Sequence, residues 1–286
     1  MKPRLQYFSF VFAVLVLAAF ISATSVFGRA EETLIIAGTG TSTGTMKLMA
    51  EGFQKQHPGI TVIVLPSIGS SGGIRAVAED KIGIALSSRP LKPEERGAGI
   101  TEEAYGRTAV IFGVQESNSA DGFTLAEIEE IYTRKRSVWL NGTPIRLILR
   151  PRTDTLSIYL ASISPGLKLA SEKAYSIPGV FVGMTDQEAT TQIEKTPGAF
   201  GISSAAIVLT EKIKIKALSI EGIAPTLSNV ATGKYPYTLT FFLIYKRDKY
   251  KGSVKDFVEF VFSQDGKKLL SHHDHVTLLR ATGRVR

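Results

Sequence analysis

The chain has 286 residues, with 34 basic and 26 acidic side chains and a formal net charge of +8 at pH 7. It contains no cysteine, which excludes both a disulfide framework and a lipid attached through a cysteine thiol. Nucleic-acid binding would need basic residues clustered with aromatic ones. The nearest approach is the short run at residues 132–136, which we interpret as a solvated helix end.

The N-terminus predicts a secretory signal peptide over residues 1–30. Two basic residues precede an apolar run at residues 8–21, and small residues lead to Ala30. The run is shorter than the roughly 20 residues that a membrane-spanning helix needs, so we expect cleavage after Ala30. A retained membrane anchor is the alternative. The expected location is the periplasm.

The predicted mature chain is long enough for one large domain or two modest lobes. Removing Lys2, Arg4 and Arg29 lowers the net charge from +8 to +5. This mild positive charge favours anionic ligands slightly through long-range attraction. No internal repeat or long linker is found, and we expect a monomer.

Short β-branched runs alternate with helical patterns in the first part of the mature chain. The expected elements are a strand at 33–37, a helix at 46–56, a strand at 60–65, a helix that starts near Ile74 and a strand at 81–86. This alternation favours a parallel sheet with crossover helices.

A long buried strand at residues 107–115 precedes a second α/β series. Thr124 is expected to cap a helix, with Glu127 as its capping-box partner. The later expected elements are strands at 145–149, 199–203 and 237–245 and helices at 156–163, 186–194 and 253–270. The predicted fold class is α/β in two lobes, and the periodicity alone does not show which of the later elements return to the first lobe.

Three glycine- or hydroxyl-bearing loops, Gly38–Thr45, Gly69–Gly73 and Arg150–Thr155, each follow an expected strand and precede a helix. Helix N-termini present free amides and a positive dipole end, which suit an oxyanion. Taken singly, each loop could be an ordinary helix cap. The candidate ligand-binding residues in these loops are Thr41, Ser42, Thr43, Ser70, Ser71, Gly72, Arg150, Thr153, Asp154 and Thr155.

Other chemistries find less support in the sequence. The dinucleotide fingerprint is broken at Thr43, and no glycine-lysine-serine/threonine triplet is present. His57 is isolated, and the histidines at 272, 273 and 275 lie in a polar run that we expect to be solvated, so neither a metal nor a cofactor is expected.

Residues Gly69–Gly73 also match the G-x-S-x-G pattern of a hydrolase nucleophile, with Ser71 as the serine. A triad would need an acid and then a histidine further along the chain, and the candidates are Asp265 or Asp274 with His272, His273 or His275. The motif is short, and no HGGG-like oxyanion segment precedes the serine. We therefore expect no enzyme and keep the serine hydrolase as a lesser alternative.

Several segments resemble the periplasmic phosphate-binding proteins of ABC importers over nearly the whole mature chain. The segments are "AGTGTSTGTMKLMAEGF", "SIGSSGGIRAVAEDKIGIALSSRPLKPEE", "FTLAEIEEIYTRKRSVWLNGTPIRLILR", "PGAFGIS", "YPYTLTFFLIYK" and "VKDFVEFVFSQDGKKLL". The resemblance implies a two-lobed type II solute-binding fold with mixed sheets, helices on both faces and a ligand cleft between the lobes. The first lobe would comprise residues 31–112 plus 240–286, and the second lobe residues 113–239. The resemblance also implies a partner permease in the inner membrane.

By the same resemblance, Ser42 and Ser70 would be hydroxyl donors from the first two loops, with the amide of Thr43 assisting. Arg150 would be the clamp from the other lobe. Thr153, Asp154 and Thr155 would match a serine-glycine-threonine run at the start of a helix.

Two departures from the family pattern concern specificity. Ser88 stands where the family usually has an aspartate that accepts a hydrogen bond from protonated phosphate. Asp154 replaces a neutral serine, and Leu156 replaces a threonine. Because a buried unpaired carboxylate facing a dianion is unfavourable, Asp154 would have to pair with Arg150 or Arg152, point away, or face a different ligand.

The expected function is capture of a small oxyanion, with phosphate first, and its delivery to an ABC permease. The alternative is a type II fold that serves as a non-transport anion sensor or as a partner-binding module.

Overall fold

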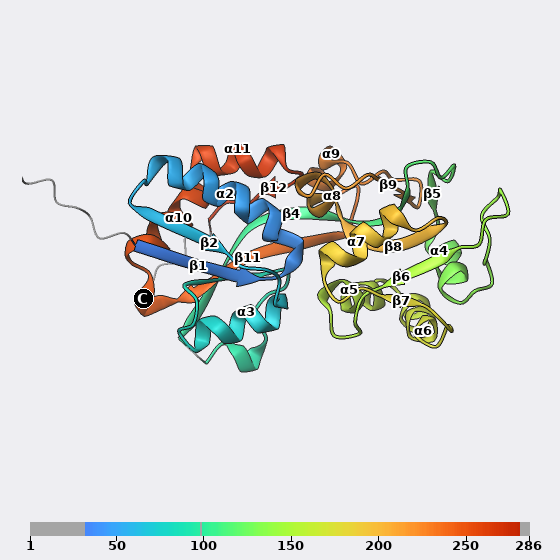
Figure 1. The fold of residues 1–286 in the computed structure, drawn as a ribbon, viewed down its shortest axis with the longest axis horizontal. Helices are drawn as coiled ribbons and strands as arrows, with labels where there is room; N and C mark the ends of the chain where they lie inside the picture. The colour runs from blue at the N-terminus through green and yellow to red at the C-terminus, as the bar shows by residue number, and fades with distance from the viewer. Residues whose placement is uncertain (1–31, 98, 281–286) are drawn as a thin grey trace, which may run out of the picture.

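The computed structural model describes residues 32–97 and 99–280, so the predicted signal peptide lies outside the described residues. Its main sheet has ten strands, in the order β2-β1-β3-β11-β4-β8-β6-β7, with β9 and β12 also paired to β4. Two groups of elements lie on either side of a central crossing, and the long strand β4 (Ile100–Gln115) runs through both (Figure 1). We name the groups lobe 1 and lobe 2.

Lobe 1 contains the first three strands and both ends of the described chain. Its elements are β1 (Glu32–Gly38), η1 (Gly40–Ser42), α2 (Thr43–Gln56), β2 (Ile60–Val64), α3 (Gly69–Ala78), β3 (Ile84–Ser87), η2 (Pro93–Glu95), β11 (Thr238–Lys246), η3 (Arg247–Lys249), α10 (Gly252–Phe262), α11 (Gln264–His272) and β12 (Val276–Thr277). Strand β1 is parallel to β2 and β3, whereas β11 is antiparallel to β3 and β4. The sheet is therefore mixed.

Lobe 2 is formed by the middle of the chain. Its elements are β5 (Gly122–Phe123), α4 (Leu125–Tyr132), β6 (Arg146–Leu149), α5 (Thr155–Ile163), α6 (Pro165–Ala174), β7 (Phe181–Val182), α7 (Asp186–Lys195), β8 (Ala199–Ser204), α8 (Ala205–Thr210), β9 (Ile215–Ala217), β10 (Ser219–Ile220) and α9 (Leu227–Ala231). Strands β6 and β7 are parallel, and β8 joins this group to β4.

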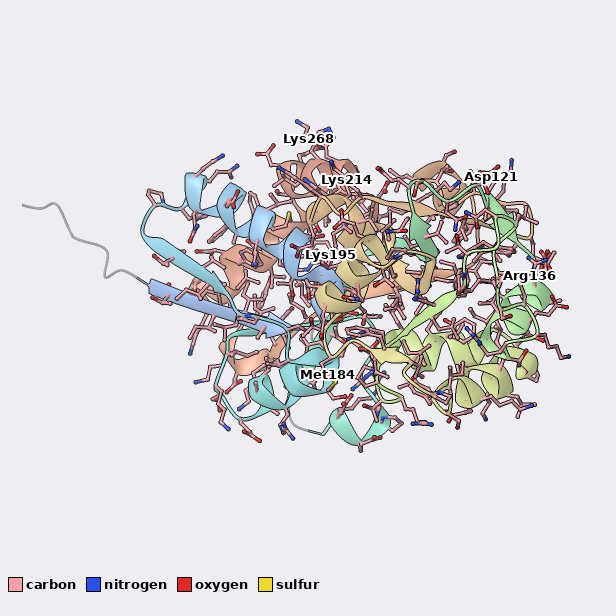
Figure 2. The ribbon with its side chains drawn as sticks, turned by 45° about the vertical axis from the view of Figure 1, so that its right-hand side comes forward. Asp121, Arg136, Met184, Lys195, Lys214 and Lys268 are labelled. Atoms are coloured by element: carbon pink, nitrogen blue, oxygen red, sulfur yellow. The ribbon has the colours of Figure 1, made fainter. Side chains whose placement is uncertain are left out.

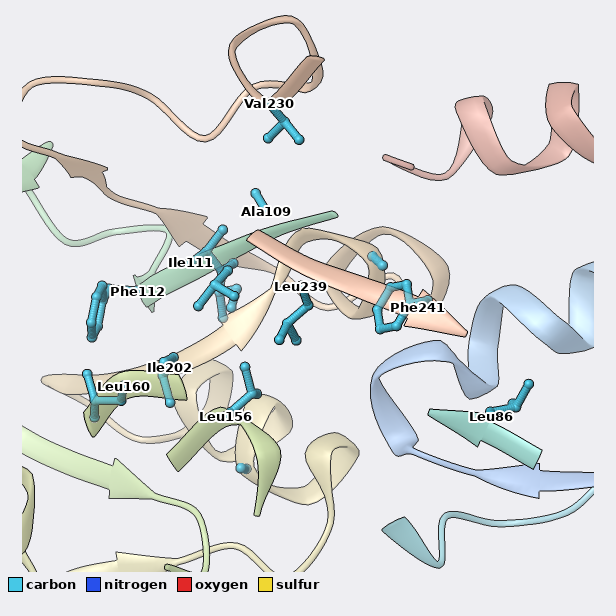
Figure 3. Close-up of a cluster of buried hydrophobic side chains, with 14 of the residues drawn as sticks. Leu86, Ala109, Ile111, Phe112, Leu156, Leu160, Ile202, Val230, Leu239 and Phe241 are labelled. Carbon is cyan, nitrogen blue, oxygen red and sulfur yellow. The ribbon is translucent and has the colours of Figure 1, made fainter. Parts of the chain in front are cut away.

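Strands β4 and β11 connect the lobes. Residues 100–109 of β4 pair with β11, and β4 pairs with β8 from Val110 onward. Apolar side chains surround this crossing, among them Ile111 and Leu239 (Figure 3). One hydrophobic core therefore continues from lobe 1 into lobe 2.

The capping box at Thr124 is confirmed, because its Oγ1 accepts from the amide of Glu127 and the Glu127 carboxylate accepts from the Thr124 amide. The single helix predicted at 253–270 is wrong. It is divided at Ser263, which ends α10 and caps α11 by accepting from the amide of Gly266. Helices α6, α8 and α9 were not predicted.

Residues Gly69–Gly73, predicted as a loop, form the first turn of α3 instead. Gly69 adopts a φ of +72° at the start of the helix, a conformation that glycine takes readily. Within residues 32–97 and 99–280, no helix combines the length and the apolar character needed to cross a membrane.

Candidate functional site

Four hydroxyl side chains of lobe 1 form a continuous hydrogen-bonded row, which we call the hydroxyl chain. Thr41 Oγ1 lies 2.7 Å from Thr39 Oγ1, which lies 3.2 Å from Ser88 Oγ, which in turn lies 3.4 Å from Ser70 Oγ. All four residues are at most 5 % exposed. The chain therefore joins three separate segments at the carboxyl end of the parallel strands, where ligands bind in open α/β sheets.

The glycines around β1 allow these segments to come together. A Cβ added to Gly73 of α3 would lie 2.9 Å from the Cα of Gly38 and 3.0 Å from the carbonyl oxygen of Ala37. The first turn of α3 therefore lies directly against the end of β1, and Ser70 comes within reach of Ser88, whose amide donates to Ser70 Oγ at 3.2 Å.

The other predicted residues of the first loop have different surroundings. Ser42 is fully buried, and neither its hydroxyl nor that of Tyr105 has a hydrogen-bond partner among the described residues. Burial raises the pKa of Tyr105. Thr43 donates from its hydroxyl to the carbonyl of Thr39 at 3.1 Å and so holds the loop in place. Thr39, which was not among the predicted site residues, links Thr41 to Ser88 in the hydroxyl chain.

Ser71 is exposed, and its hydroxyl accepts a hydrogen bond from Nη2 of Arg89 at 2.9 Å. Arg89 also pairs with Glu95 at 2.7 Å. The next residue, Gly72, has the side chain of Ile68 as its nearest neighbour. In the described part of the chain, the Ser71 hydroxyl is thus bonded to an arginine and not to a histidine.

The histidines proposed for a triad lie elsewhere. His275, expected to be solvated, is fully buried against the rings of Tyr105 and Phe241, and burial lowers its pKa to about 4. Its Nδ1 lies 2.6 Å from the carbonyl oxygen of His273. These ring contacts explain why His275 belongs to the core, whereas His272 is exposed and His273 is partly buried. Among the described residues no cluster of His, Cys, Asp or Glu could hold a metal ion.

Arg150 projects from the end of β6 and is 4 % exposed. Its guanidinium has partners on three sides. Nη1 donates to the carbonyl of Gly183, Nη2 donates to Asp154 Oδ2 at 2.8 Å, and Nε lies 3.4 Å from Asp186 Oδ1. One buried cation is therefore shared between two carboxylates.

Asp154 pairs with Arg150, which is one of the arrangements expected from its sequence position. Besides pairing with Arg150, it caps α5 by accepting from the amide of Leu156 at 2.9 Å. The N-terminus of α5 is thereby satisfied by the chain's own carboxylate. Thr153 is exposed, and Thr155 is partly buried at the start of the helix.

Arg152 lies on the surface. Its guanidinium is 2.9 Å from Glu172 and stacks over the ring of Tyr175 at 4.0 Å. Leu156 is buried in the core beside the crossing strands (Figure 3). Of the residues in the third loop, only Arg150 and Asp154 therefore join the buried charged cluster.

Asp186, the first residue of α7, was not among the predicted site residues. It is 3 % exposed and approaches lobe 1 so closely that a Cβ added to Gly40 would lie 2.5 Å from its Oδ2. Burial raises the pKa of Asp186 to about 7, and the nearby Asp154 carboxylate also raises it. The Arg150 guanidinium and the amides of Thr41 and Gly40 act in the opposite direction.

The lobes touch each other beside this cluster. Gln187 Nε2 donates to the carbonyl of Gly40 at 2.9 Å, and a Cβ added to Gly44 of α2 would lie 2.4 Å from the hydroxyl of Thr210 in α8. Figure 2 labels Met184, on the segment that leads into α7 at this junction.

A groove of about 340 Å³ lies between the lobes on the side of α5. Its lining includes Ser88 and Arg89 from lobe 1, Thr155 and Tyr159 from α5, and Leu239 from β11. Ser88 belongs to both the groove and the hydroxyl chain. The groove therefore connects the hydroxyl chain with the space between the lobes.

Comparison with known proteins identifies the family. A family model described as "PBP superfamily domain" matches residues 25–265. The phosphate-binding protein PstS of Bacillus subtilis is 27 % identical over 250 residues, which cover 84 % of this chain and 78 % of that protein. Phosphate-binding protein PstS 2 of Streptococcus pneumoniae is 32 % identical over 106 residues, only 37 % of this chain and 36 % of that protein.

A similar architecture is found in a solved structure from Clostridium perfringens, described as a putative phosphate ABC transporter substrate-binding protein with bound phosphate. It superposes with a TM-score of 0.74 at 23 % sequence identity, covering 86 % of this chain and all of that one. At this identity the likeness establishes the shared two-lobed α/β fold.

Proposed function

The chain belongs to the PBP superfamily, and from this premise we propose that it binds a small oxyanion, with phosphate first, between its lobes. The family is one of solute-binding proteins rather than enzymes. We propose further that the protein loses its signal peptide and acts outside the cytoplasm as a monomer. It would make no covalent bond to the ligand and would deliver the anion to an ABC permease. The lobes are proposed to comprise residues 31–112 with 240–286, and residues 113–239.

The observation that carries this proposal is the approach of two kinds of anion-binding group from opposite lobes. Lobe 1 contributes the hydroxyl chain and the amides of Gly40 and Thr41. Lobe 2 contributes Arg150, whose planar guanidinium can hold two oxygens of an oxyanion. Closing the lobes removes water from the ligand, which strengthens each hydrogen bond to it. The relatives named as phosphate-binding proteins support phosphate as the first candidate.

The test is oxyanion binding by the purified protein, first by thermal shift against phosphate, sulfate, molybdate, tungstate and phosphonates, because a ligand that binds only the folded state raises Tm. Isothermal titration then compares wild type with Arg150→Ala and Arg152→Ala. We expect Arg150→Ala to lose at least about 30-fold in affinity, since truncating a buried charged partner costs about 2–5 kcal/mol.

Arg152→Ala is the matched control, because Arg152 is exposed and paired with Glu172. It should bind with the affinity of the wild type. Unchanged affinity in Arg150→Ala would remove Arg150 from the binding site. No binding of any oxyanion by the wild type would favour the alternative, in which the fold serves as a sensor or partner-binding module.

A further inference from the structure

Asp186 places a carboxylate where lobe 1 presents its backbone amides. Its Oδ2 is in contact with the backbone at Gly40, and the amides of Gly40 and Thr41 favour its ionised form. Free amides at the start of a helix are the groups that bind anions. Asp186 therefore stands, as part of the chain, in the position of an anionic ligand.

The Asp186 carboxylate also faces the guanidinium of Arg150 in lobe 2. Arg150 Nη2 is bonded to Asp154, and its Nε faces Asp186 Oδ1 at 3.4 Å. Within the described residues, neither this Nε nor this Oδ1 has a hydrogen-bond partner, although both are buried. The Arg150 and Asp186 side chains therefore face each other without a hydrogen bond between Nε and Oδ1. Buried polar atoms without a hydrogen-bond partner are energetically unfavourable.

The local charge opposes a second anion. With both aspartates ionised, one guanidinium faces two carboxylates, so an entering oxyanion meets a net negative charge at low solvent exposure. At the same junction, Gln187 of α7 is bonded to the carbonyl of Gly40 and lies 3.4 Å from Glu211, the residue that ends α8. Glu211 adds a further acidic group to this side of the junction.

We propose that Asp186 is an internal anion that fills the oxyanion site of the ligand-free protein, and that an external oxyanion replaces it only when Asp186 has taken up a proton from solvent. This inference rests on the proposed function, since it concerns regulation of the same site. Protonation removes the charge that holds the carboxylate at the Gly40 and Thr41 amides and that repels the ligand. Binding at pH 8 then consumes one proton.

The test compares phosphate binding by wild type and Asp186→Asn at pH 6 and pH 8, using isothermal titration. Asparagine has the shape of the protonated acid and carries no charge. With a pKa of about 7, Asp186 is protonated in roughly a tenth of wild-type molecules at pH 8 and roughly nine tenths at pH 6. Asp186→Asn should therefore bind about tenfold more tightly than wild type at pH 8 and about equally at pH 6.

The ratio between the two proteins cancels the titration of phosphate itself. Asp121→Asn is the matched control, because the Asp121 side chain is 94 % exposed and lies far from the Met184 segment (Figure 2). It should behave as wild type at both pH values. Weaker binding by Asp186→Asn would overturn the inference and make Asp186 an acceptor for the ligand's own proton. An equal affinity at pH 8, or a ratio that is independent of pH, would also overturn it.

A measurement without ligand separates this inference from the proposed function. In the ligand-free wild type, the amide NMR signals of Gly40 and Thr41 should shift with a midpoint near pH 7, and Asp186→Asn should abolish the shift. Failure of every oxyanion to bind would reject the proposed function and leave the NMR result to decide the inference. Amide signals that do not titrate in the wild type would overturn the inference whatever the binding data show.

Discussion

Ser70 and Ser71 are adjacent in the first turn of α3, but their hydroxyls have different partners. Ser70 is buried in the hydroxyl chain and accepts from the amide of Ser88. Ser71 faces outward and accepts from Arg89. A helix turns by about 100° per residue, so neighbouring side chains point in different directions. The two serines therefore offer a matched pair for mutation.

We expect Ser70→Ala to weaken phosphate binding by roughly 10- to 100-fold, because a hydrogen bond to a charged group contributes about 1.5–3 kcal/mol. Ser71→Ala should change the affinity by less than about twofold, within the usual range of surface substitutions. Isothermal titration of both variants measures the difference. A larger loss in Ser71→Ala than in Ser70→Ala would contradict the assignment of the hydroxyl chain.

Asp186 should also make stability depend on pH. Its pKa is about 7 in the folded protein against an ordinary value of 3.8, so the folded state holds a proton that the unfolded state has released between these values. The free energy of unfolding therefore falls as pH rises from about 4 to about 7 and is level above that. Asp186→Asn removes this dependence.

Urea unfolding at several pH values measures the effect. Asp186→Asn should match the wild type near pH 4 and be more stable at pH 8, by up to about 4 kcal/mol. Parallel curves for the two proteins across this range would show that Asp186 ionises normally.

The sequence predicted some residues of the site but not all of them. Ser70 and Arg150 follow strands in glycine- or hydroxyl-rich segments, and this pattern indicated them, whereas Ser88 was indicated by the resemblance to the family. Asp186 follows a threonine cap at the start of a helix, which is the usual place for an acidic residue. Asp186 is distinguished by its contacts with Gly40, 146 positions earlier in the chain, and with Arg150, 36 positions earlier, and such contacts leave no local pattern.

At the scale of single elements, the position of α3 depends on how closely it packs on β1. Gly73→Ala would place a methyl group 2.9 Å from the Cα of Gly38, so one backbone has to move. We expect a loss of about 1–3 kcal/mol in the free energy of unfolding, as for other overpacked sites. Phosphate affinity should fall as well, because the movement displaces Ser70.

Gly97→Ala is the control, since a Cβ there meets no atom within 4 Å. Urea unfolding should find it within about 0.5 kcal/mol of the wild type. A Gly73→Ala protein as stable as Gly97→Ala would mean that α3 can shift away from β1 without loss.

The start of α3 also shows where prediction of the elements failed. Glycine is among the least favourable residues for a helix, at about 1 kcal/mol relative to alanine, so a segment with three glycines in five residues resembles a loop. Contact with β1 overrides this preference, and the helix begins at Gly69. The boundaries of β1, β2 and α7 were closer to prediction, because their apolar periodicity is not interrupted by glycine.

At the scale of the whole molecule, α2 of lobe 1 packs closely against α8 of lobe 2 at Gly44. Gly44→Leu would direct a side chain into Thr210, whose Cβ lies 2.9 Å from the position of an added Cβ. Because this clash lies between the lobes rather than inside either one, the lobes can avoid it by separating. We expect at least about tenfold weaker phosphate binding, with a larger radius of gyration and little change in the far-ultraviolet circular dichroism.

Small-angle X-ray scattering with and without phosphate measures the separation, and Gly97→Leu serves as the control for an added leucine. A Gly44→Leu protein that binds phosphate normally would show that the contact seen between α2 and α8 is not needed for binding.

The pairing of strands within and between the lobes could be predicted only in part from the sequence. Strands β1 to β3 were recognised as a parallel series because a helix lies between each strand and the next in the chain. The return of β11 between β3 and β4 brings together residues that are more than 100 positions apart, and local periodicity contains no information on that pairing. The resemblance to known binding proteins supplied the two-lobed arrangement.

The hydroxyl chain also affects which ionic forms of an oxyanion the protein can bind. Each hydroxyl can give one proton and receive others, so the whole row from Thr41 to Ser70 can reverse its polarity without moving a heavy atom. Lobe 1 can then offer either a proton or a lone pair at the end of the row. It therefore adapts to different ionic forms of a bound oxyanion, and discrimination between them falls to the charged groups across the cleft.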